Sequence, residues 1–417
     1  MTIHLDDEPV VAERGEPVAV ALVAAGHVAL ARSPKFHRPR GPACLRGACD
    51  GCLARVDGVP NVMTCRIPSR EGLRVETQNV VGSRDTDLLR VADWFFPEGM
   101  NHHELLAGVP GLQRVFQGIA RRVAGIGRLP DAVVSPRTAR RREVDVLVVG
   151  AGPAGMAAAV ELASRGRDVH VVDDDLASGG AARILEALVP GPWRPSVTAF
   201  AEAVAGAHVH LSLRTTAAGV YGDDVLLATE RADDAGVEGV EVVRARTLVL
   251  APGAHDGGVA FEGNDVPGVM SARAGCRLLA HRVVAGRNVV VARIGEGGPF
   301  GRAYATARPD ATVVQGTPLR VIGSARVRAV VFATPDGQTG ERRLPCDGLL
   351  VDGPSSPAYE LASQAGAELS HEERGFVVRT GRAGRIRDGV FAVGEVTGAA
   401  VEPDAIAAAV REMASEA

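Results

Sequence analysis

The hydrophobic residues of the larger, C-terminal part of the chain are grouped in short, uninterrupted runs. The run at 146–149 leads into a glycine-rich turn and a helical stretch, and a second run follows at 169–172. Two later runs, at 247–251 and 390–393, also end in glycine-containing turns, and a helical stretch follows at 404–416. Continuous apolar strands that alternate with helices are typical of parallel sheets. The pattern predicts an α/β domain.

The first 80 residues follow a different pattern. The segment 10–26, VVAERGEPVAVALVAAG, predicts a strand end, a turn and an amphipathic helix, and 53–65, LARVDGVPNVMTC, predicts a hairpin that turns at VDGVP. A small β-grasp, ferredoxin-like domain over 1–80 would contain both. Residues 81–142 combine partial helical periodicity with an arginine-rich, proline-containing stretch. They are predicted to be a helical connector and linker.

Composition and charge narrow the class of protein. A chain of 417 residues is expected to form two or three domains, and 46% hydrophobic residues with only 4% aromatics indicate cores of small aliphatic side chains. A net charge of -4 gives no basic field for nucleic acid or an acidic membrane. The N-terminus lacks a basic signal region, and the longest apolar run, 17–30, is too short for a transmembrane segment. A cytoplasmic location is expected.

Four of the six cysteines lie close together, with the spacing Cys44-x4-Cys49-x2-Cys52-x12-Cys65. The C-x4-C-x2-C part with a distal fourth cysteine is typical of the plant-type [2Fe–2S] loop, and we predict that these four thiols bind the cluster. Two alternatives remain. Zinc sites with four cysteines usually show two CxxC pairs, and a thioredoxin-like CxxC needs neither Cys44 nor Cys65. Cys276 and Cys346 lie in apolar contexts and are expected in the core.

The sequence GAGPAG after the first strand is a dinucleotide-binding fingerprint in the required strand–turn–helix setting. Gly150 permits the tight turn, Gly152 lets backbone amides approach a diphosphate at the helix N-terminus, and Gly155 lets the helix pack on the strand. Asp173 follows the second strand, where a carboxylate meets ribose hydroxyls, and Asp174 is an adjacent candidate. The predicted cofactor-binding residues are Gly150, Gly152, Pro153, Ala154, Gly155, Asp173, Asp174, Gly180, Gly253, Gly394 and Glu395.

Residues 288–307 resemble a second nucleotide-binding start, with Gly295 and Gly297, but Phe300 stands at the expected position of the third glycine. The following helix is short, and the segment is small for a nicotinamide-binding domain. We therefore predict a degenerate lobe over 276–345, inserted into an FAD-binding domain made of 143–275 and 346–417.

Several motifs together resemble the alpha subunits of heteromeric amine and amino-acid oxidoreductases. They are HRPRG before the cysteines, GAGPAGMAAA, FEGNDVPGVM, and a cysteine ahead of DGLLVDG. Sarcosine oxidase, opine oxidase, dye-linked proline dehydrogenase and hydrogen cyanide synthase belong to this group. The resemblance extends from about residue 31 to the last residue. It implies a flavoprotein with two dinucleotide-binding domains, whose second nucleotide lobe is shortened here, fused to the ferredoxin-like domain.

The resemblance also implies a division of labour between subunits. A beta subunit, related to D-amino-acid oxidases and carrying its own FAD, would oxidise the C–N bond of an amine or amino acid. The alpha subunit would bind FAD at Gly394-Glu395 and the first glycine turn, and pass electrons onward. Some members hold FMN between the subunits, and in some the first site holds NAD or ATP. Glu395 replaces the more usual aspartate.

Three functional hypotheses follow. No Ser–His–Asp set, activated cysteine or carboxylate pair stands out, so we predict no catalytic side chain and expect the cofactors to carry the chemistry. The first hypothesis is an electron-transfer subunit of an amine or amino-acid dehydrogenase. The second is a self-sufficient NAD(P)H-dependent reductase that uses the 288–307 region. The third is a scaffold subunit with a structural nucleotide.

Overall fold

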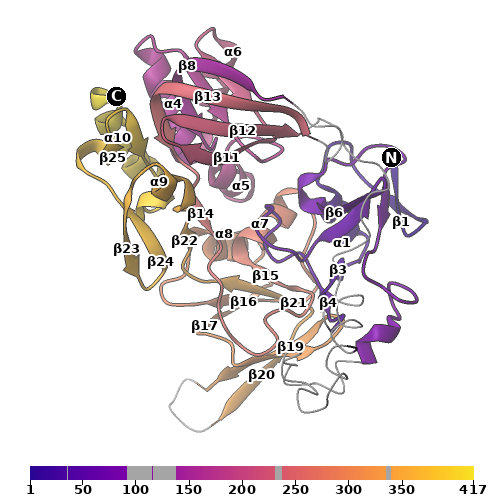
Figure 1. The fold of residues 1–417 in the computed structure, drawn as a ribbon. Helices are drawn as coiled ribbons and strands as arrows, with labels where there is room; N and C mark the ends of the chain where they lie inside the picture. The colour runs from indigo at the N-terminus through magenta and orange to yellow at the C-terminus, as the bar shows by residue number, and fades with distance from the viewer. Residues whose placement is uncertain (35, 92–114, 116–137, 231–236, 335–339) are drawn as a thin grey trace.

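The computed structural model of the protein describes residues 1–34, 36–91, 115, 138–230, 237–334 and 340–417. Most of the predicted connector over 81–142 lies outside these ranges. Figure 1 shows three bodies: an N-terminal domain, a large sheet with its helices, and a second, smaller α/β lobe. The mixed α/β class predicted from the sequence is confirmed.

The N-terminal domain is a five-stranded sheet in the order β2-β1-β7-β5-β6. Its parallel pair, β1 with β7, lies at the centre, and the other pairs are antiparallel. Val18, Leu22 and their neighbours on α1 are buried against this sheet. The predicted hairpin is confirmed as β5 and β6, which turn at Asp57 and Gly58. The elements are β1 Thr2–Leu5, β2 Glu8–Val11, α1 Val18–Ala24, β3 Ala31–Arg32, β4 Pro39–Arg40, β5 Leu53–Val56, β6 Val59–Met63, η1 Thr64–Arg66, β7 Arg74–Glu76 and η2 Leu88–Arg90.

The large sheet has the order β10-β9-β8-β13-β12-β11, and β26 pairs with β13. Strands β10, β9, β8, β13 and β26 are parallel, so their carboxyl ends meet at one edge. Helix α4 contacts both α6 and α10, and the apolar side chains of all three helices share the main core. The elements are β8 Arg140–Val149, α4 Pro153–Ser164, β9 Val169–Val172, α5 Gly180–Leu188, α6 Arg194–Ala205, β10 Val209–Ser212, β11 Thr215–Tyr221, β12 Asp224–Glu230, β13 Val237–Leu250, β25 Arg385–Arg387, β26 Val390–Ala392 and α10 Pro403–Glu416.

The second lobe is a parallel sheet in the order β15-β21-β16-β17, with a three-stranded antiparallel sheet of β18, β19 and β20 beside it. Helices α7 and α8 contact each other and also α5, which belongs to the large sheet. The elements are β15 Val269–Ser271, α7 Ala272–Ala280, β16 Val289–Arg293, α8 Pro299–Ala307, β17 Thr312–Gln315, β18 Arg320–Gly323, β19 Val327–Ala333, β20 Glu341–Pro345 and β21 Gly348–Asp352.

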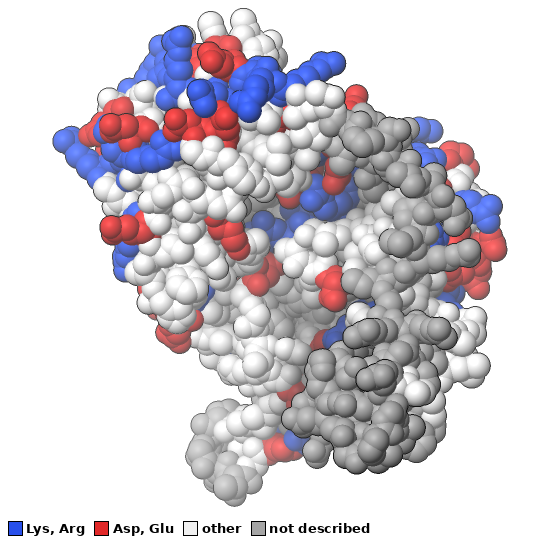
Figure 2. Space-filling view, viewed as in Figure 1, with Lys and Arg blue, Asp and Glu red and all other residues white. Residues whose placement is uncertain are grey.

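Further short elements lie along the chain between the strands and helices of the two α/β bodies. They are β14 Ala254–His255, β22 Ser356–Pro357, α9 Glu360–Gln364, β23 Glu368–Glu372, β24 Gly375–Arg379, η3 Arg382–Gly384 and η4 Glu395–Thr397. Basic side chains lie deep in the hollow between the large sheet and the rest of the molecule (Figure 2). In the described part of the chain, no helix combines the length and the apolarity that crossing a bilayer requires.

Candidate cofactor sites

The four clustered cysteines occupy one loop and the start of η1, and their sulfurs form two pairs. The Sγ atoms of Cys44 and Cys49 are 3.3 Å apart. Cys52 and Cys65 also lie within hydrogen-bonding reach of each other, and this contact lowers the pKa of the Cys52 thiol. The hydrogen bond from Cys44 likewise lowers the pKa of Cys49, to about 6. Because all six cysteines are free, none of these pairs is a disulfide.

The backbone of the cysteine loop is shaped around the sulfurs. The amides of Arg46 and Ala48 donate to Sγ of Cys44 over 3.4 and 3.3 Å, and the amide of Gly47 donates to Sγ of Cys65 over 3.2 Å. Amides that point at sulfur stabilise its negative charge. A side chain at Gly51 would place Cβ 1.9 Å from the carbonyl oxygen of Gly41, so only glycine fits there.

The pairing of the thiols bears on the kind of metal centre. The four thiols form two pairs, Cys44 with Cys49 and Cys52 with Cys65. A two-iron cluster takes one pair of thiolates on each iron. The pairing therefore fits the ligand set of a [2Fe–2S] cluster. Cys276 and Cys346 are buried in the core, as expected.

The first glycine turn joins β8 to α4 at the edge of the large sheet. Gly150 has a φ of 101°, and a Cβ at Gly155 would lie 1.8 Å from the Gly150 carbonyl oxygen, so helix and turn are in direct contact. Gly152, the N-cap of α4, is different: no atom of the described residues would lie within 4 Å of its Cβ. The open side of Gly152 faces the cavity that Pro153, Ala154 and Gly180 also line.

Asp173 follows β9 and lies at the same edge. Its carboxylate accepts hydrogen bonds from the amides of Ala151, at 2.5 Å, and Asp175, at 2.8 Å. Burial raises the pKa of Asp173 to about 6, although these two amides oppose the shift. Asp174 also lines the cavity, but it is paired with Arg66 and its side chain is 52% exposed. Of the two predicted acids, Asp173 is the one held beside the glycine turn.

The opposite wall of the cavity comes from the ends of β13 and β26. Gly253 and Gly394 have φ values of 78° and 86°, and a Cβ at Gly394 would lie 2.7 Å from that of Ala154. The Glu395 carboxylate accepts from Arg273 at 3.3 Å and from Ser355 at 3.4 Å. All eleven predicted cofactor-binding residues thus lie in one region. Ten of them line this cavity, and Gly155 packs against Gly150, which is one of the ten.

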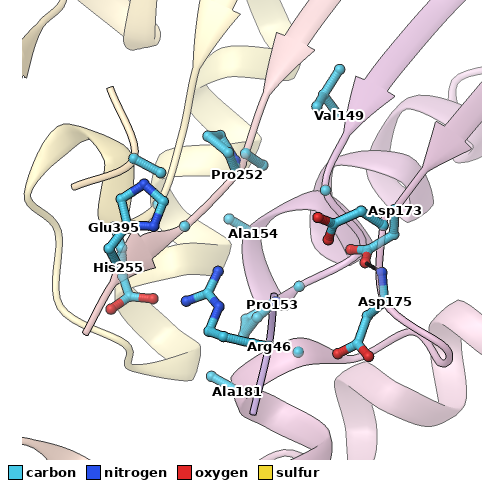
Figure 3. Close-up of a pocket in the computed structure, with 18 of the residues that line it drawn as sticks. Arg46, Val149, Pro153, Ala154, Asp173, Asp175, Ala181, Pro252, His255 and Glu395 are labelled. Carbon is cyan, nitrogen blue, oxygen red and sulfur yellow. Dashed lines mark hydrogen bonds between the residues drawn. The ribbon is translucent and has the colours of Figure 1, made fainter. Parts of the chain in front are cut away.

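Arginines from the N-terminal domain complete this cavity. Arg46 and Arg66 line it together with Cys65, and Figure 3 shows Arg46 reaching in between Pro153 and Glu395. Arg46 donates to the carbonyl oxygen of Ala254, and Arg66 pairs with Glu230 at 3.3 Å. Neither residue was among those predicted from the sequence. Their only local signal was their position next to Leu45 and Cys65 in the cysteine loop.

Two family models match the domains that contain these residues. Residues 1–80 match the family model of the 2Fe-2S iron-sulfur cluster binding domain, and residues 144–306 match that of pyridine nucleotide-disulphide oxidoreductase. Sarcosine oxidase subunit alpha of Rhizobium meliloti is 30% identical over 299 residues, which are 66% of this chain and 30% of that protein. Hydrogen cyanide synthase subunit HcnA of Pseudomonas aeruginosa is 42% identical over 79 residues, which are 19% of this chain and 75% of that protein. The chain belongs to the family that contains the sarcosine oxidase alpha subunits and the hydrogen cyanide synthase subunits.

A solved structure extends the likeness over nearly all of this chain. L-proline dehydrogenase from P. horikoshii superposes with a TM-score of 0.72 at 22% identity, over 99% of this chain and 72% of that chain. At this identity the likeness concerns the fold alone. The subunit spans 28–30% of the sarcosine oxidase alpha subunits that it matches. The family matches support an iron–sulfur cluster and a flavin as its cofactors.

The second lobe of the subunit requires one correction. The link from β8 to α4 has three residues, 150–152, but the link from β16 to α8 has five, 294–298. Counted from the helix start, Gly301 rather than Phe300 therefore stands where Gly155 stands in the first turn. Phe300 is buried, with the Arg273 guanidinium 4.6 Å from its ring centre. The assignment of Phe300 to the third glycine was wrong because the longer link shifts the register.

Proposed function

We propose that this oxidoreductase subunit transfers electrons within a heteromeric amine or amino-acid dehydrogenase or oxidase. A partner subunit related to D-amino-acid oxidases, with its own flavin, would convert the C–N single bond of the substrate to C=N. That step releases two electrons and two protons. The electrons would reach FAD and the [2Fe–2S] cluster of this subunit, and then an external acceptor. FMN held between the two subunits is part of the same proposal.

One observation carries the proposal: the cysteine loop forms a wall of the nucleotide cavity. Cys65 and Arg46 line a cavity of about 280 Å³ together with Gly150, Gly152 and Glu395. Cys44 and Cys49 line a second cavity of about 1000 Å³. Electron transfer needs cofactors held in close proximity and separated by protein rather than by bulk water. A cluster on this loop would meet that need.

The second cavity adjoins the first, since His255, Arg273 and Glu395 line both. The two thiol pairs therefore lie toward different spaces, with Cys65 at the nucleotide cavity and the Cys44–Cys49 pair at the neighbouring one. This placement supports a path in which the cluster receives electrons on one side and delivers them on the other. The second cavity offers room for an acceptor or for the FMN of the proposal.

The residue roles follow from this proposal. Cys44, Cys49, Cys52 and Cys65 would hold the cluster. The backbone amides of Gly152, Ala154, Gly155 and Gly180 would receive the diphosphate of FAD beside the ring of Pro153, which has no amide hydrogen to donate. Asp173 would receive the adenosine ribose. Gly253, Gly394 and Glu395 would lie along the ribityl chain and flavin. Asp174 would act through Arg66, as a contact between domains.

The proposal is tested on the complex copurified with its partner subunit. Amino acids and secondary amines are added one at a time without oxygen. We expect one class of substrate to bleach the flavin absorbance and to produce the electron paramagnetic resonance signal of a reduced [2Fe–2S] cluster. Cys65→Ser should abolish that signal while substrate still bleaches the partner's flavin.

Cys346→Ser is the matched control, because this cysteine is buried and belongs to neither thiol pair. It should leave both the cluster signal and the bleaching unchanged. The proposal fails if the wild-type complex stays oxidised with every amine and amino acid tried. It also fails if substrate reduces the cluster of the Cys65→Ser complex as fully as that of the wild type.

A further inference from the structure

In the second lobe, a side chain of the protein itself fills the turn between β16 and α8, residues 294–298. Asp352, at the end of β21, is 3% exposed. Its carboxylate accepts hydrogen bonds from the amide of Gly298, at 2.9 Å, and from the amide of Gly301, at 3.1 Å. These amides are the N-cap and the third residue of α8. Free amides at a helix N-terminus are the groups that bind a diphosphate in dinucleotide-binding folds.

The glycines of this turn close tightly around the same carboxylate. A Cβ at Gly297, Gly298 or Gly301 would lie 2.6, 3.0 or 2.2 Å from an oxygen of Asp352. Arg293 lies 3.5 Å from this carboxylate and compensates its charge. The space that is open beside Gly152 in the large-sheet body is therefore occupied by Asp352 at the matching turn of the second lobe.

The second lobe also differs from the large-sheet body at the position where a ribose would bind. Strand β17 pairs in parallel with β16, as β9 pairs with β8. Asp173 follows β9, whereas β17 ends at Gln315. Gln315 is exposed, and its side-chain amide donates to the carbonyl oxygen of Gly295. Gln315 pairs with Arg293 as Val172 pairs with Val149, so Gly316 stands where Asp173 stands, and no carboxylate is there to accept two ribose hydroxyls.

We propose that Asp352 excludes nicotinamide dinucleotides from the second lobe by occupying the position of their diphosphate. An incoming diphosphate would meet a buried side chain at the point where it needs amide donors, and the amides of Gly298 and Gly301 already donate to that side chain. Asp352 is thus a specificity-determining residue. With FAD in the first glycine turn, the chain would then need an electron donor other than NADH or NADPH.

This inference does not rest on the partner-fed transfer of electrons, because it concerns only binding to the second lobe. A failure of the substrate experiment above would leave it untouched. Conversely, binding of NADH by the second lobe would not by itself prevent reduction by an amine.

The test measures binding of NADH and NADPH to the full chain by calorimetry and by the fluorescence of the reduced nicotinamide. Excess FAD keeps the first turn filled. Two variants are compared with wild type: Asp352→Ala, which removes the carboxylate, and Asp352→Asn, which keeps its shape without the charge. Asp347→Ala is the matched control, since Asp347 accepts from the amides of Arg287, at 3.1 Å, and Asn288, at 2.8 Å, elsewhere in the same lobe.

We expect wild type and Asp347→Ala to show no saturable binding, and Asp352→Ala to gain affinity by at least about tenfold. Asp352→Asn should gain less, because its amide still occupies the space. Two results would overturn the inference. One is saturable binding by wild type at the strength of the variants, and the other is no gain in either variant while both keep the wild-type melting temperature.

Discussion

At the scale of single residues, the raised pKa of Asp173 predicts how the stability of the fold depends on pH. Burial raises its pKa from the ordinary value of 3.8 to about 6 in the folded chain. A carboxyl group with a raised folded-state pKa stabilises the fold fully below pH 3.8 and loses that contribution as the pH rises through 6. Above pH 6 the ionised, buried carboxylate therefore makes the nucleotide-free protein less stable than a neutral side chain would.

Asp173→Asn isolates this effect, since asparagine cannot ionise and can still accept a hydrogen bond from an amide. The difference in melting temperature, variant minus wild type, should become more positive between pH 4 and pH 7. Thermal unfolding of both proteins without nucleotide, over that range, measures it. A difference that stays constant or falls would mean that the pKa of Asp173 is not raised. At pH 7.5 the variant should also bind nucleotide more weakly, because it lacks the charged acceptor for ribose.

At the scale of elements, two glycines of one turn should fail in different ways. A Cβ at Gly155 would meet the backbone of Gly150 at 1.8 Å, so Gly155→Ala must displace α4 from β8. We expect it to destabilise the nucleotide-free fold by about 2 kcal/mol or more. Gly152 has a φ of -76° and open space beside it, so Gly152→Ala should leave the melting temperature unchanged.

The same Gly152→Ala change should weaken nucleotide binding by about tenfold or more, because the methyl group enters the space meant for the diphosphate. Unfolding curves of the apoprotein and the amount of acid-released nucleotide per chain separate the two effects. Equal loss of stability in both variants would contradict this assignment of roles.

How far these elements could be predicted depends on how local their signals are. The fingerprint from Gly150 to Gly155 and the cysteine spacing lie within single loops, so the sequence alone predicted both sites and the fold that presents them. Arg46 contacts Ala254, which is 208 positions away, and Asp352 contacts the turn before α8, which is 51–54 positions away. Nothing in the neighbouring residues of Arg46 or Asp352 indicates these contacts. The register error at Phe300 has a similar cause, since only packing reveals a link that is two residues longer.

At the scale of the whole molecule, one guanidinium joins the three bodies. Arg277 lies on α7 of the second lobe (Figure 1). It donates to the carbonyl oxygen of Leu45 in the cysteine loop at 3.1 Å, and it pairs at 2.5 Å with Asp175 of the large sheet. Burial of Asp175 opposes its ionisation, yet Arg277 and Arg183 outweigh burial and hold its pKa below the ordinary value. The cysteine loop is therefore fixed to the nucleotide cavity from both α/β bodies.

Arg277→Met removes the charge and keeps much of the apolar volume, so it should leave Asp175 without its nearest partner and release the carbonyl of Leu45. Loss of one member of a buried pair costs on the order of 3 kcal/mol. We expect calorimetry to show an earlier unfolding transition, and stopped-flow reduction of the complex to show slower cluster reduction, because the loop no longer holds a fixed distance to the flavin. Arg320→Met is the control, since Arg320 and Glu341 form an exposed pair in the second lobe, at 2.6 Å, whose loss should change the melting temperature little because solvent screens the pair. If both variants unfold alike and reduce the cluster at the wild-type rate, docking of the N-terminal domain does not depend on Arg277, and the closeness of the two cofactor sites must come from the apolar contacts between the bodies.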